Sequence, residues 1–323
     1  MVLPLLGAMY GGCVIDIQGL GFRYSGAAHD TLQDINLQVP AGSVFGLLGP
    51  NGAGKSTLLN ILCGLLHFET GKVHIDGLCV RRQSHLIKPF SALVPQDFAF
   101  YPQLTAMENL RFFARVLGLR GQGAKNEITR CIAIAQLEKH AHTRAAVFSG
   151  GLKRRLNLAI GLLSQPRLIF LDEPTVGVDA QSRHFLLQSI RELNREHGVT
   201  VVYTSHYMEE VQFLCDQVAI IDHGRICLAG PLQELLQSHS QLLKVRVKQL
   251  PTPDFLQQLR RHWPQMQLDD PGTLTLSDSD AEAVAALLKY LQAQGLQVCE
   301  ISYGSRNRLE DIFLDTTQRQ LRD

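Results

Sequence analysis

Residues 49–57 have the composition of a phosphate-binding loop. They read GPNGAGKST and follow the apolar stretch SVFGLL. Glycines allow backbone N–H groups to point at phosphate oxygens, Lys55 can reach the β and γ phosphates of a nucleotide, and the hydroxyl of Ser56 can bind Mg²⁺. A strand before the motif and a helix after it are the context that this chemistry requires. We therefore expect a nucleotide to bind at Gly49, Pro50, Asn51, Gly52, Ala53, Gly54, Lys55, Ser56 and Thr57.

Two acidic residues end the apolar stretch RLIFL at 167–171. At the mouth of a buried parallel strand, Asp172 can hold a hydrated Mg²⁺, and Glu173 can orient a water molecule for in-line attack on the γ-phosphorus. Buried carboxylates without such a role would be costly. The alternative is a strand that merely ends in acidic turn residues, and the phosphate-binding motif in the same chain favours the catalytic interpretation.

A second glycine-rich helix start, SGGLKRR, occupies residues 149–155. Ser149 has the side chain of a helix N-cap, and the N–H groups of Gly150 and Gly151 would lie at the positive end of the helix dipole. Such a helix start can bind an anion. Taken alone, however, the stretch is more typical of a capped surface helix.

The motifs GPNGAGKST, SGGLKRR, LDEPTVGVD and TSH, in this order within residues 14–236, resemble those of the nucleotide-binding subunit of an ATP-binding-cassette (ABC) transporter. The resemblance implies an ATPase whose copies pair head to tail, so that Ser149, Gly150 and Gly151 of one copy close over the γ-phosphate held by the other copy's loop. The tail NRLEDIFLDTT is similar to the end of exporter-branch ATPases that serve separate membrane subunits.

The same resemblance implies ligands, partners and a location. The ligands are ATP and Mg²⁺, and the partners are a second ATP-binding subunit, in a homodimer, and a polytopic membrane permease. The permease would hold the cytoplasmic ATPase on the inner face of the cell membrane. Phe98, Phe100 and Tyr101 would offer the permease an apolar seat, and the alternative is that these aromatic rings pack in the core.

Further site residues follow from the resemblance, position by position. Tyr24 matches the aromatic residue that stacks on adenine, and Gln96 matches the glutamine that contacts Mg²⁺ and water. His206 matches the histidine that contacts the γ-phosphate, and Asp179 matches the loop that links the two sites of the dimer. The expected catalytic residues are thus Glu173, His206 and Lys55, and the expected magnesium ligands are Ser56, Gln96 and Asp172.

Two departures from the family pattern stand near these residues. Phe148 and Leu152 replace the usual leucine and glutamine around SGG, and PTVGVD replaces the commoner PTSGLD. Neither change removes a phosphate ligand or a carboxylate, so we expect full ATPase activity.

The pattern of apolar residues and turns predicts the elements that must position these motifs. Short strands alternate with Gly, Pro and Asp turns at first, helical periodicity follows up to residue 163, and strands then return, with a hairpin turn at His223 and Gly224. The expected strands are 14–24, 31–39, 43–49, 72–77, 91–96, 167–174 and 199–206, and the expected helices are 54–66, 106–119, 126–137, 150–163 and 182–197. Together with the resemblance, this predicts an α/β P-loop NTPase fold of the ABC ATPase type over 14–238, with an inserted helical subdomain at about 97–163 and an N-terminal extension at 1–13.

A different pattern begins at about residue 239. The order strand, helix, strand, strand, helix, strand predicts a small α+β domain of ferredoxin-like type over 239–323, and the tail 307–321 reads as a final amphipathic helix. The domain has no phosphate-binding loop, no clustered metal ligands and no candidate nucleophile. We therefore expect it to be an accessory or regulatory domain that supports the dimer.

Composition narrows the range of partners. The chain has 31 Lys and Arg against 30 Asp and Glu, a net charge of +1, so nucleic acid is not expected as a partner. Seven scattered cysteines without a C-x-x-C pair indicate reduced thiols in the cytosol. No apolar run approaches the ~20 residues of a membrane helix, so a membrane role must come through another chain.

Two other functions remain open from the sequence. The first is a soluble ABC ATPase that remodels a partner such as ribosomes or DNA, although such relatives usually have two cassettes or coiled-coil insertions and this chain has one cassette and no heptads. The second is a regulatory ATPase that uses its last domain as a sensor. A detergent-solubilised pull-down distinguishes a permease from the other partners.

Overall fold

The computed structural model describes residues 12–237, 241–248, 253–268, 272–277, 281–305, 309–310 and 312–313. The chain divides between residues 232 and 233 into two compact units. The first unit carries every motif from residue 49 to residue 206. Among the described residues, no helix combines the length and the apolar character needed to cross a membrane.

A six-stranded sheet forms the centre of the first unit, in the order β10-β9-β3-β8-β7-β6. Strand β3 pairs in parallel with β8 and β9, and β7 pairs in parallel with β6 and β8, whereas β10 is antiparallel to β9. All residues of β3 and β8 are buried, as is typical of parallel strands covered on both faces. The carboxyl ends of β3, β7 and β8 therefore open at one edge of the sheet. The strands are β3 (Val44–Leu48), β6 (Ser91–Val94), β7 (Leu168–Asp172), β8 (Thr200–Ser205), β9 (Gln217–Asp222) and β10 (Arg225–Pro231).

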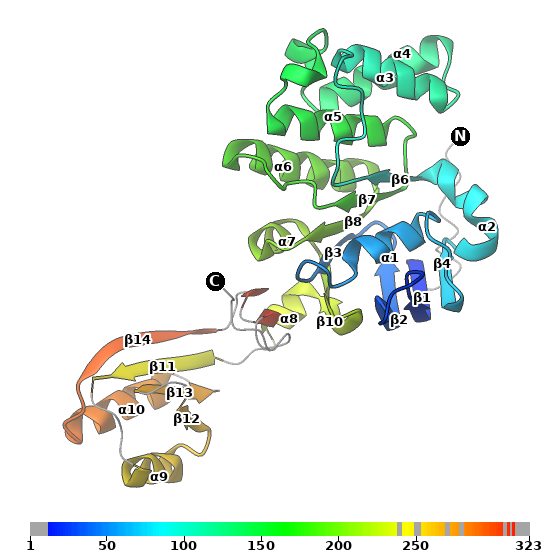
Figure 1. Ribbon diagram of the computed structural model, residues 1–323. Coiled ribbons are helices and arrows are strands. Elements are labelled where there is room, and N and C mark those ends of the chain that lie inside the picture. The colour runs from blue at the N-terminus through cyan, green and yellow to red at the C-terminus, as the bar shows by residue number, and fades with distance from the viewer. Residues whose placement is uncertain are drawn as a thin grey trace. The chain divides into compact units, whose positions relative to one another are not determined.

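An antiparallel sheet, in the order β2-β1-β4-β5, shares a hydrophobic core with the central sheet. Along β2 the buried residues alternate with more exposed ones, so that one face, with Ile35, Leu37 and Val39, is turned into this core. Helix α1 (Lys55–Leu62) contributes Leu58 and Leu59 to the same core. Figure 1 shows α1 beside the strands β1, β2 and β4. The strands are β1 (Cys13–Phe22), β2 (Leu32–Pro40), β4 (Thr70–Ile75) and β5 (Leu78–Cys79).

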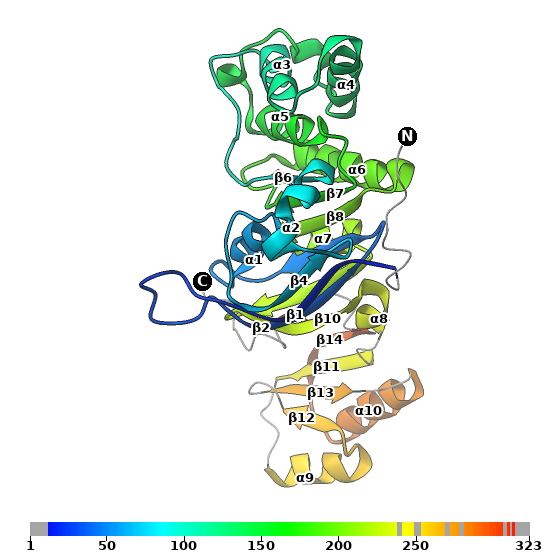
Figure 2. The same ribbon diagram turned by 90° about the vertical axis from the view of Figure 1, so that its right-hand side faces the viewer.

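Three helices form a separate helical region after β6: α3 (Ala106–Val116), α4 (Gly121–Ile134) and α5 (Gly150–Leu162). Figures 1 and 2 show them together at one end of the first unit. Helix α3 begins with a capping box between Thr105 and Glu108, and α5 begins after the N-cap Ser149. Helix α6 (Ala180–His197) begins after the N-cap Asp179 and ends at Gly198, whose φ of +63° suits glycine.

Most expected elements are present, and the differences have local causes. Helix α1 ends at Leu62 instead of residue 66, because Gly64 takes a left-handed φ of +65°. Helix α4 begins at Gly121 instead of residue 126, because glycine is tolerated in the first turn, where few intrahelical hydrogen bonds are at stake. The short helix α2 (Val80–Ile87), with non-helical angles at Gln83, was not among the expected elements. His223 and Gly224 both have positive φ, as the predicted hairpin turn requires.

The second unit confirms the ferredoxin-like pattern. Its strands form an antiparallel sheet in the order β12-β13-β11-β14, and its core contains Leu243, Val245, Leu259, Leu287 and Leu291. The elements are α8 (Leu232–Gln237) at the boundary, followed by β11 (Gln241–Val247), α9 (Pro253–His262), β12 (Met266–Leu268), β13 (Thr273–Ser277), α10 (Ala281–Ala293) and β14 (Val298–Ser305). Residues 309–310 and 312–313 of the expected tail helix are helical, and the rest of that helix lies outside the described residues. The same holds for residues 1–11 of the expected N-terminal extension.

Candidate functional site

The loop after β3 requires glycine at particular positions. Gly52 and Gly54 have φ of +81° and +109°, which other residues rarely adopt. A Cβ atom on Gly49 would lie 2.3 Å from the carbonyl oxygen of Ile221, and one on Gly54 would lie 2.7 Å from Leu32 Cδ2. The loop is thus pressed against β9 and β2, and it leads directly into the first turn of α1.

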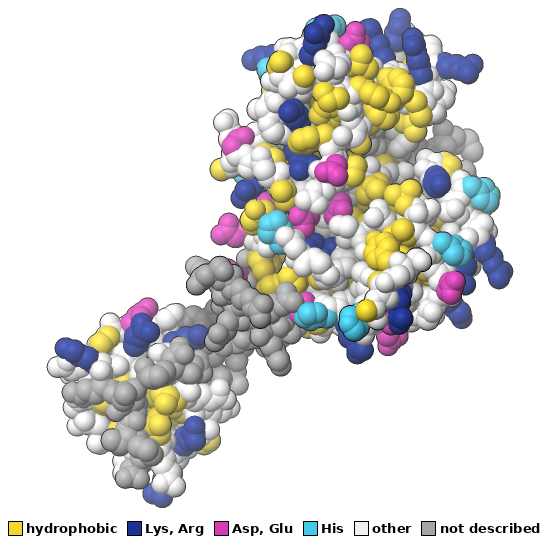
Figure 3. All heavy atoms as spheres, viewed as in Figure 1, with side chains coloured by type: hydrophobic (Ala, Val, Ile, Leu, Met, Phe, Trp, Pro, Cys, Tyr) yellow, Lys and Arg dark blue, Asp and Glu magenta, His cyan; other side chains and the backbone are white. Residues whose placement is uncertain are grey.

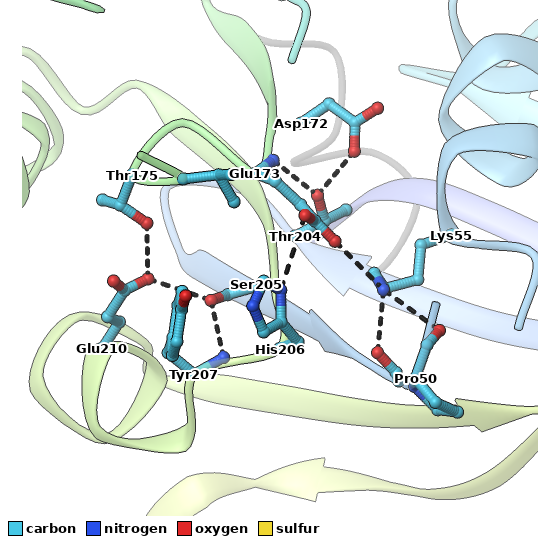
Figure 4. A network of polar contacts seen from close by, with 12 residues as sticks. Pro50, Lys55, Asp172, Glu173, Thr175, Thr204, Ser205, His206, Tyr207 and Glu210 are labelled. Carbon is cyan, nitrogen blue, oxygen red and sulfur yellow. Dashed lines mark hydrogen bonds and ion pairs between the residues drawn. The ribbon is translucent and has the colours of Figure 1, made fainter. Parts of the chain in front are cut away.

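Lys55 is a buried cation at the start of α1, with only 4% of its side chain exposed. Its Nζ donates hydrogen bonds to the carbonyl oxygens of Gly49, at 2.8 Å, and Pro50, at 3.2 Å. The same Nζ lies 3.2 Å from Glu173 Oε1, so the lysine joins the loop to the end of β7 (Figure 4). The N–H groups of the first helical turn have no intrahelical partner and add positive potential at this place.

Glu173 has an unusual backbone for a residue with a side chain. Its φ of +45° is left-handed, a conformation that costs about 1–3 kcal/mol and persists only where the surroundings impose it. Here its N–H donates to Thr204 Oγ1 at 2.9 Å, and the Thr204 hydroxyl donates to Asp172 Oδ1 at 2.7 Å. One threonine on the neighbouring strand β8 therefore orients both acidic residues.

His206 is the third polar side chain at this edge of the sheet, beside Lys55 and Glu173. Its Nδ1 lies 3.4 Å from Glu173 Oε2, and one third of its side chain is exposed. Glu173 thus stands between an ammonium group and an imidazole, with one carboxylate oxygen toward each (Figure 4). The structure brings together the three residues predicted to be catalytic, although they lie on three different parts of the chain.

Tyr24 follows β1 and lies beside the phosphate-binding motif. Its hydroxyl is 3.1 Å from Thr57 Oγ1, and its ring meets that of Phe22 edge-on at 4.8 Å between centroids. The tyrosine remains 43% exposed, which leaves ring surface free for a base to stack on.

The residues expected to bind Mg²⁺ lie on three different elements. Ser56 is exposed in the first turn of α1, Asp172 is half-buried at the end of β7, and Gln96 is exposed after β6. Among the described residues, no group of three or more His, Cys, Asp or Glu could hold a metal ion by itself. A hydroxyl, an amide and a carboxylate are oxygen donors of the kind that Mg²⁺ prefers, and this ion usually completes its shell with substrate phosphates and water.

Two residues that were not expected hold the segment around Gln96. The guanidinium of Arg154 donates to the carbonyl oxygens of Gln96 and Val176. Asn157, one turn later on α5, donates to the Pro95 carbonyl at 3.0 Å and accepts from the N–H of Ala99 at 3.0 Å. Asn157 is a polar residue within the apolar run LNLAIGLL, which was an available signal, whereas Arg154 stands in the basic run KRR and gave none.

The SGG motif begins α5 on the helical region. Ser149 Oγ accepts a hydrogen bond from the N–H of Leu152 at 3.3 Å, and both Ser149 and Gly150 are exposed. Gly151, in contrast, is buried, and a Cβ atom there would lie 2.2 Å from Ser182 Oγ on α6 of the same chain. In Figures 1 and 2, α6, β7 and β8 lie between the level of α5 and the level of α1.

Asp179 caps the helix against which the SGG motif packs. Its Oδ1 accepts from the N–H of Ser182 at 2.9 Å, and hydrogen bonds from Ser182 hold the pKa of the carboxyl below its usual value. The segment that ends in Asp179 also meets Gly150, where an added Cβ atom would lie 2.9 Å from the Gly177 carbonyl oxygen. The structure thus places Asp179 beside SGG within one chain.

Comparisons with known proteins show which family the chain belongs to. The family model described as ABC transporter matches residues 32–176. The linearmycin resistance ATP-binding protein LnrL of Bacillus subtilis is 36% identical over 303 residues, which cover 90% of this chain and 95% of that protein. The chain belongs to the ABC transporter ATP-binding proteins. The Nod factor export ATP-binding protein I of a Rhizobium species is 35% identical, over 89% of this chain and 92% of its own length.

Solved structures of ABC cassettes have the same fold as the first unit. A dimeric cassette in a post-hydrolysis state with ADP and Pi superposes with a TM-score of 0.62 and 26% identity, over 67% of this chain and 98% of that one. The cbiO1 protein of Clostridium perfringens, part of an ABC transporter complex, gives a TM-score of 0.65 and 25% identity over 70% of this chain and 91% of its own. This ABC protein is therefore an ATPase of the P-loop class.

Proposed function

We propose that this protein is the ATP-hydrolysing subunit of an exporter, in which two copies bind two MgATP head to tail and separate membrane subunits form the transport path. The position of the Glu173 carboxylate between Lys55 and His206 carries the catalytic part of this proposal. The relatives named for Nod factor export and for linearmycin resistance support the direction of transport.

The arrangement of Lys55, Glu173 and His206 suggests a separate role for each residue. Lys55 Nζ is held at the mouth of the glycine loop by carbonyl oxygens and by Glu173, and phosphate oxygens would be stronger partners for the same donors. Once Lys55 turns to phosphate, Glu173 is free to accept a proton from an attacking water. His206, 3.4 Å from the same carboxylate, would donate toward the γ-phosphate. Bound Mg²⁺ would neutralise charge on the phosphates, held by Ser56, Asp172 and Gln96.

The exposed start of α5 supports a site that is shared between two copies. Ser149 and Gly150 are exposed, and the free N–H groups of a capped helix start suit an anion. A second copy of this chain would supply that anion as the phosphate of its own nucleotide. A heterodimer with a related chain would have the same geometry. Purification of the complex therefore tests whether the second ATP-binding subunit is another copy of this chain.

Exposed aromatic rings on the helical region, and on the segment that leads from β6 into it, support a membrane partner. Figure 3 shows hydrophobic side chains gathered on this part of the molecule. Phe98, Tyr101 and Phe112 are 42%, 49% and 39% exposed, and the rings of Tyr101 and Phe112 meet edge-on. Phe100, at 9%, is buried, so it belongs to the packing and not to the expected apolar seat. We assign Phe98, Tyr101 and Phe112 to the docking of a permease on the cytoplasmic side. To the second unit we assign a regulatory role.

Turnover by a Glu173→Gln variant tests the catalytic assignment. The amide cannot accept the proton from water, so kcat should fall by about 10²–10⁴-fold while ATP still binds. The exposed Glu209→Gln on α7 (Met208–Leu214) makes the same chemical change at a residue outside the proposed site and should retain full turnover. A Glu173→Gln protein with more than half of the normal kcat would rule out this role. Pull-down in detergent tests the partner, since ribosomes or DNA in place of a polytopic protein would favour the soluble alternative.

A further inference from the structure

The chain has a second buried carboxylate, that of Glu210, near the residues proposed to be catalytic. Glu210, on α7 (Met208–Leu214), is 3% exposed. Its Oε2 accepts hydrogen bonds from Thr175 Oγ1 at 2.8 Å, Tyr203 OH at 2.6 Å and Ser205 Oγ at 2.9 Å. Its Oε1 lies 3.4 Å from Arg183 Nε on α6. Figure 4 shows this carboxylate next to the loop that carries His206, and separate from Lys55.

Two of the hydroxyl donors lie beside the proposed catalytic residues Glu173 and His206. Thr175 lies in the turn after β7 that begins at Glu173, where the N–H of Val176 donates to the Glu173 carbonyl at 3.3 Å. Ser205 is the residue before His206, and its hydroxyl also accepts from the N–H of Tyr207 at 2.9 Å. One carboxylate therefore ties the backbone around the proposed base to the backbone around the histidine.

In this cluster the hydroxyl groups donate and the Glu210 carboxylate accepts. Burial, and then the charge of Glu210, raise the pKa of Tyr203 well above its usual value, so the phenol keeps its proton and remains a donor. A buried carboxylate that receives several hydrogen bonds and faces a guanidinium is strongly held in place, whereas loss of its charge would leave those donors without a strong acceptor. Arg183 is one helical turn from Asp179, so the same carboxylate also reaches the helix start beside SGG.

We propose that Glu210 is a positioning residue for ATP hydrolysis. It sets the relative placement of Glu173 and His206 by anchoring Thr175 on one side and Ser205 on the other. The inference rests on the proposed function, because Glu210 would not contact the nucleotide and would act only through Glu173 and His206. It predicts that turnover depends on the Glu210 carboxylate while ATP binding does not.

The test compares Glu210→Gln with Glu209→Gln in the full chain. Both changes replace a carboxylate by an amide on α7, but Glu209 is exposed and Glu210 is buried. With MgATP as substrate, kcat per titrated ATP-binding site should fall about 10–100-fold in Glu210→Gln, the loss expected when a catalytic group is slightly misplaced. The Kd for ATP should stay within about threefold, since the binding loop is untouched. Glu209→Gln should match the unsubstituted protein in both quantities.

A double variant separates positioning from a folding defect. If Glu210 acts by placing His206 relative to Glu173, then adding Glu210→Gln to Glu173→Gln should lower kcat by clearly less than Glu210→Gln does in the unsubstituted chain, whereas an independent defect would multiply the two losses. If Glu210→Gln fails to bind ATP at all, Tyr203→Phe and Ser205→Ala each remove a single donor and take its place in the same comparison.

The outcomes distinguish the two proposals. Unchanged kcat in Glu210→Gln, or multiplied losses in the double variant, would overturn the positioning role and leave the ATPase assignment intact. Unchanged kcat in Glu173→Gln, or an unsubstituted chain that does not hydrolyse MgATP, would overturn both.

Discussion

At the scale of single residues, Thr204 has the clearest structural task that the sequence did not reveal. It accepts from the N–H of Glu173 and donates to Asp172, and it is fully buried. Without its hydroxyl, the strained backbone of Glu173 would lose the hydrogen bond that holds its N–H. Loss of this hydroxyl should therefore lower kcat more than it weakens ATP binding.

Thr204→Val and Thr200→Val form a matched pair on β8. Both threonines are fully buried, and Thr200 Oγ1 accepts from the N–H of Gly42 at 2.8 Å, at the end of the strand opposite the site. Each change removes a side-chain hydrogen bond and should lower the free energy of unfolding. The loss should be about 1–3 kcal/mol for Thr204→Val, which leaves the N–H of the buried Glu173 unpaired, and about 1 kcal/mol for Thr200→Val, because the N–H of the exposed Gly42 can bond to water. Only Thr204→Val should also lower kcat, by about tenfold or more, as measured by steady-state ATPase assays. Equal kcat in the two variants would show that Thr204 is merely structural.

The site residues were predictable where they follow one another in the chain. The glycines, Lys55, Asp172 and Glu173 stand in contiguous motifs whose chemistry can be read directly. Thr204 and Glu210 act through contacts between different elements, and a threonine in a strand or a glutamate in a helix gives no signal of its own. The placement of their hydrogen bonds becomes visible only once β7, β8 and α7 are packed together.

At the scale of elements, α5 connects the proposed anion site to the segment after β6. Its first residues pack on the start of α6, and one turn later Arg154 and Asn157 hold the backbone around Gln96. Desolvation lowers the pKa of Arg154 only from a very high value, so the guanidinium stays charged. A shift of α5 would thus move the Gln96 segment with it.

The neighbouring aromatic segment provides a test of coupling to a permease. Tyr101 is exposed, and the buried amide of Asn109 fixes its backbone by accepting from its N–H at 2.8 Å. Tyr101→Asp should leave basal ATPase activity within about twofold, because surface changes cost only about 0.5 kcal/mol, and should abolish co-purification with the membrane subunit. Phe100→Asp is the buried counterpart and should instead lower the thermal midpoint strongly, by burying an unpaired charge. Retained co-purification of Tyr101→Asp would exclude this docking surface.

The elements themselves were largely predictable, for reasons that differ along the chain. The capped helices α3, α5 and α6 begin within two residues of their predicted starts, because Thr105, Ser149 and Asp179 give strong N-cap signals. Helix α2 is only eight residues long, buries only Val80 and Ile87 and is interrupted at Gln83, so the sequence could not show it. The strand order of the ferredoxin-like unit depends on pairing between distant segments, which the order of elements only suggests.

At the scale of the whole molecule, the central claim is that a complete site needs two copies of the chain. Each copy contains a phosphate-binding loop with its catalytic row, and separately an exposed capped helix start at Ser149. Replacing Gly151 would not test the claim, because any side chain there collides with Ser182 of its own chain. Ser149→Asp is cleaner, since aspartate still caps a helix while its charge repels phosphate, and Ser149→Asn keeps the cap without the charge.

The most direct measurement is nucleotide trapping in mixed dimers of Lys55→Ala and Ser149→Asp chains, all carrying Glu173→Gln so that a closed site persists. Each homodimer should trap no nucleotide. A mixed dimer rebuilds one whole site, from the intact loop of the Ser149→Asp chain and the intact Ser149 of the Lys55→Ala chain, and should trap one nucleotide. Ser149→Asn homodimers should trap normally. Dimers of each variant with an otherwise unsubstituted Glu173→Gln chain also contain one whole site and show whether one site suffices for closure. Trapping in those control dimers but none in the tagged Lys55→Ala and Ser149→Asp heterodimers would contradict the shared site.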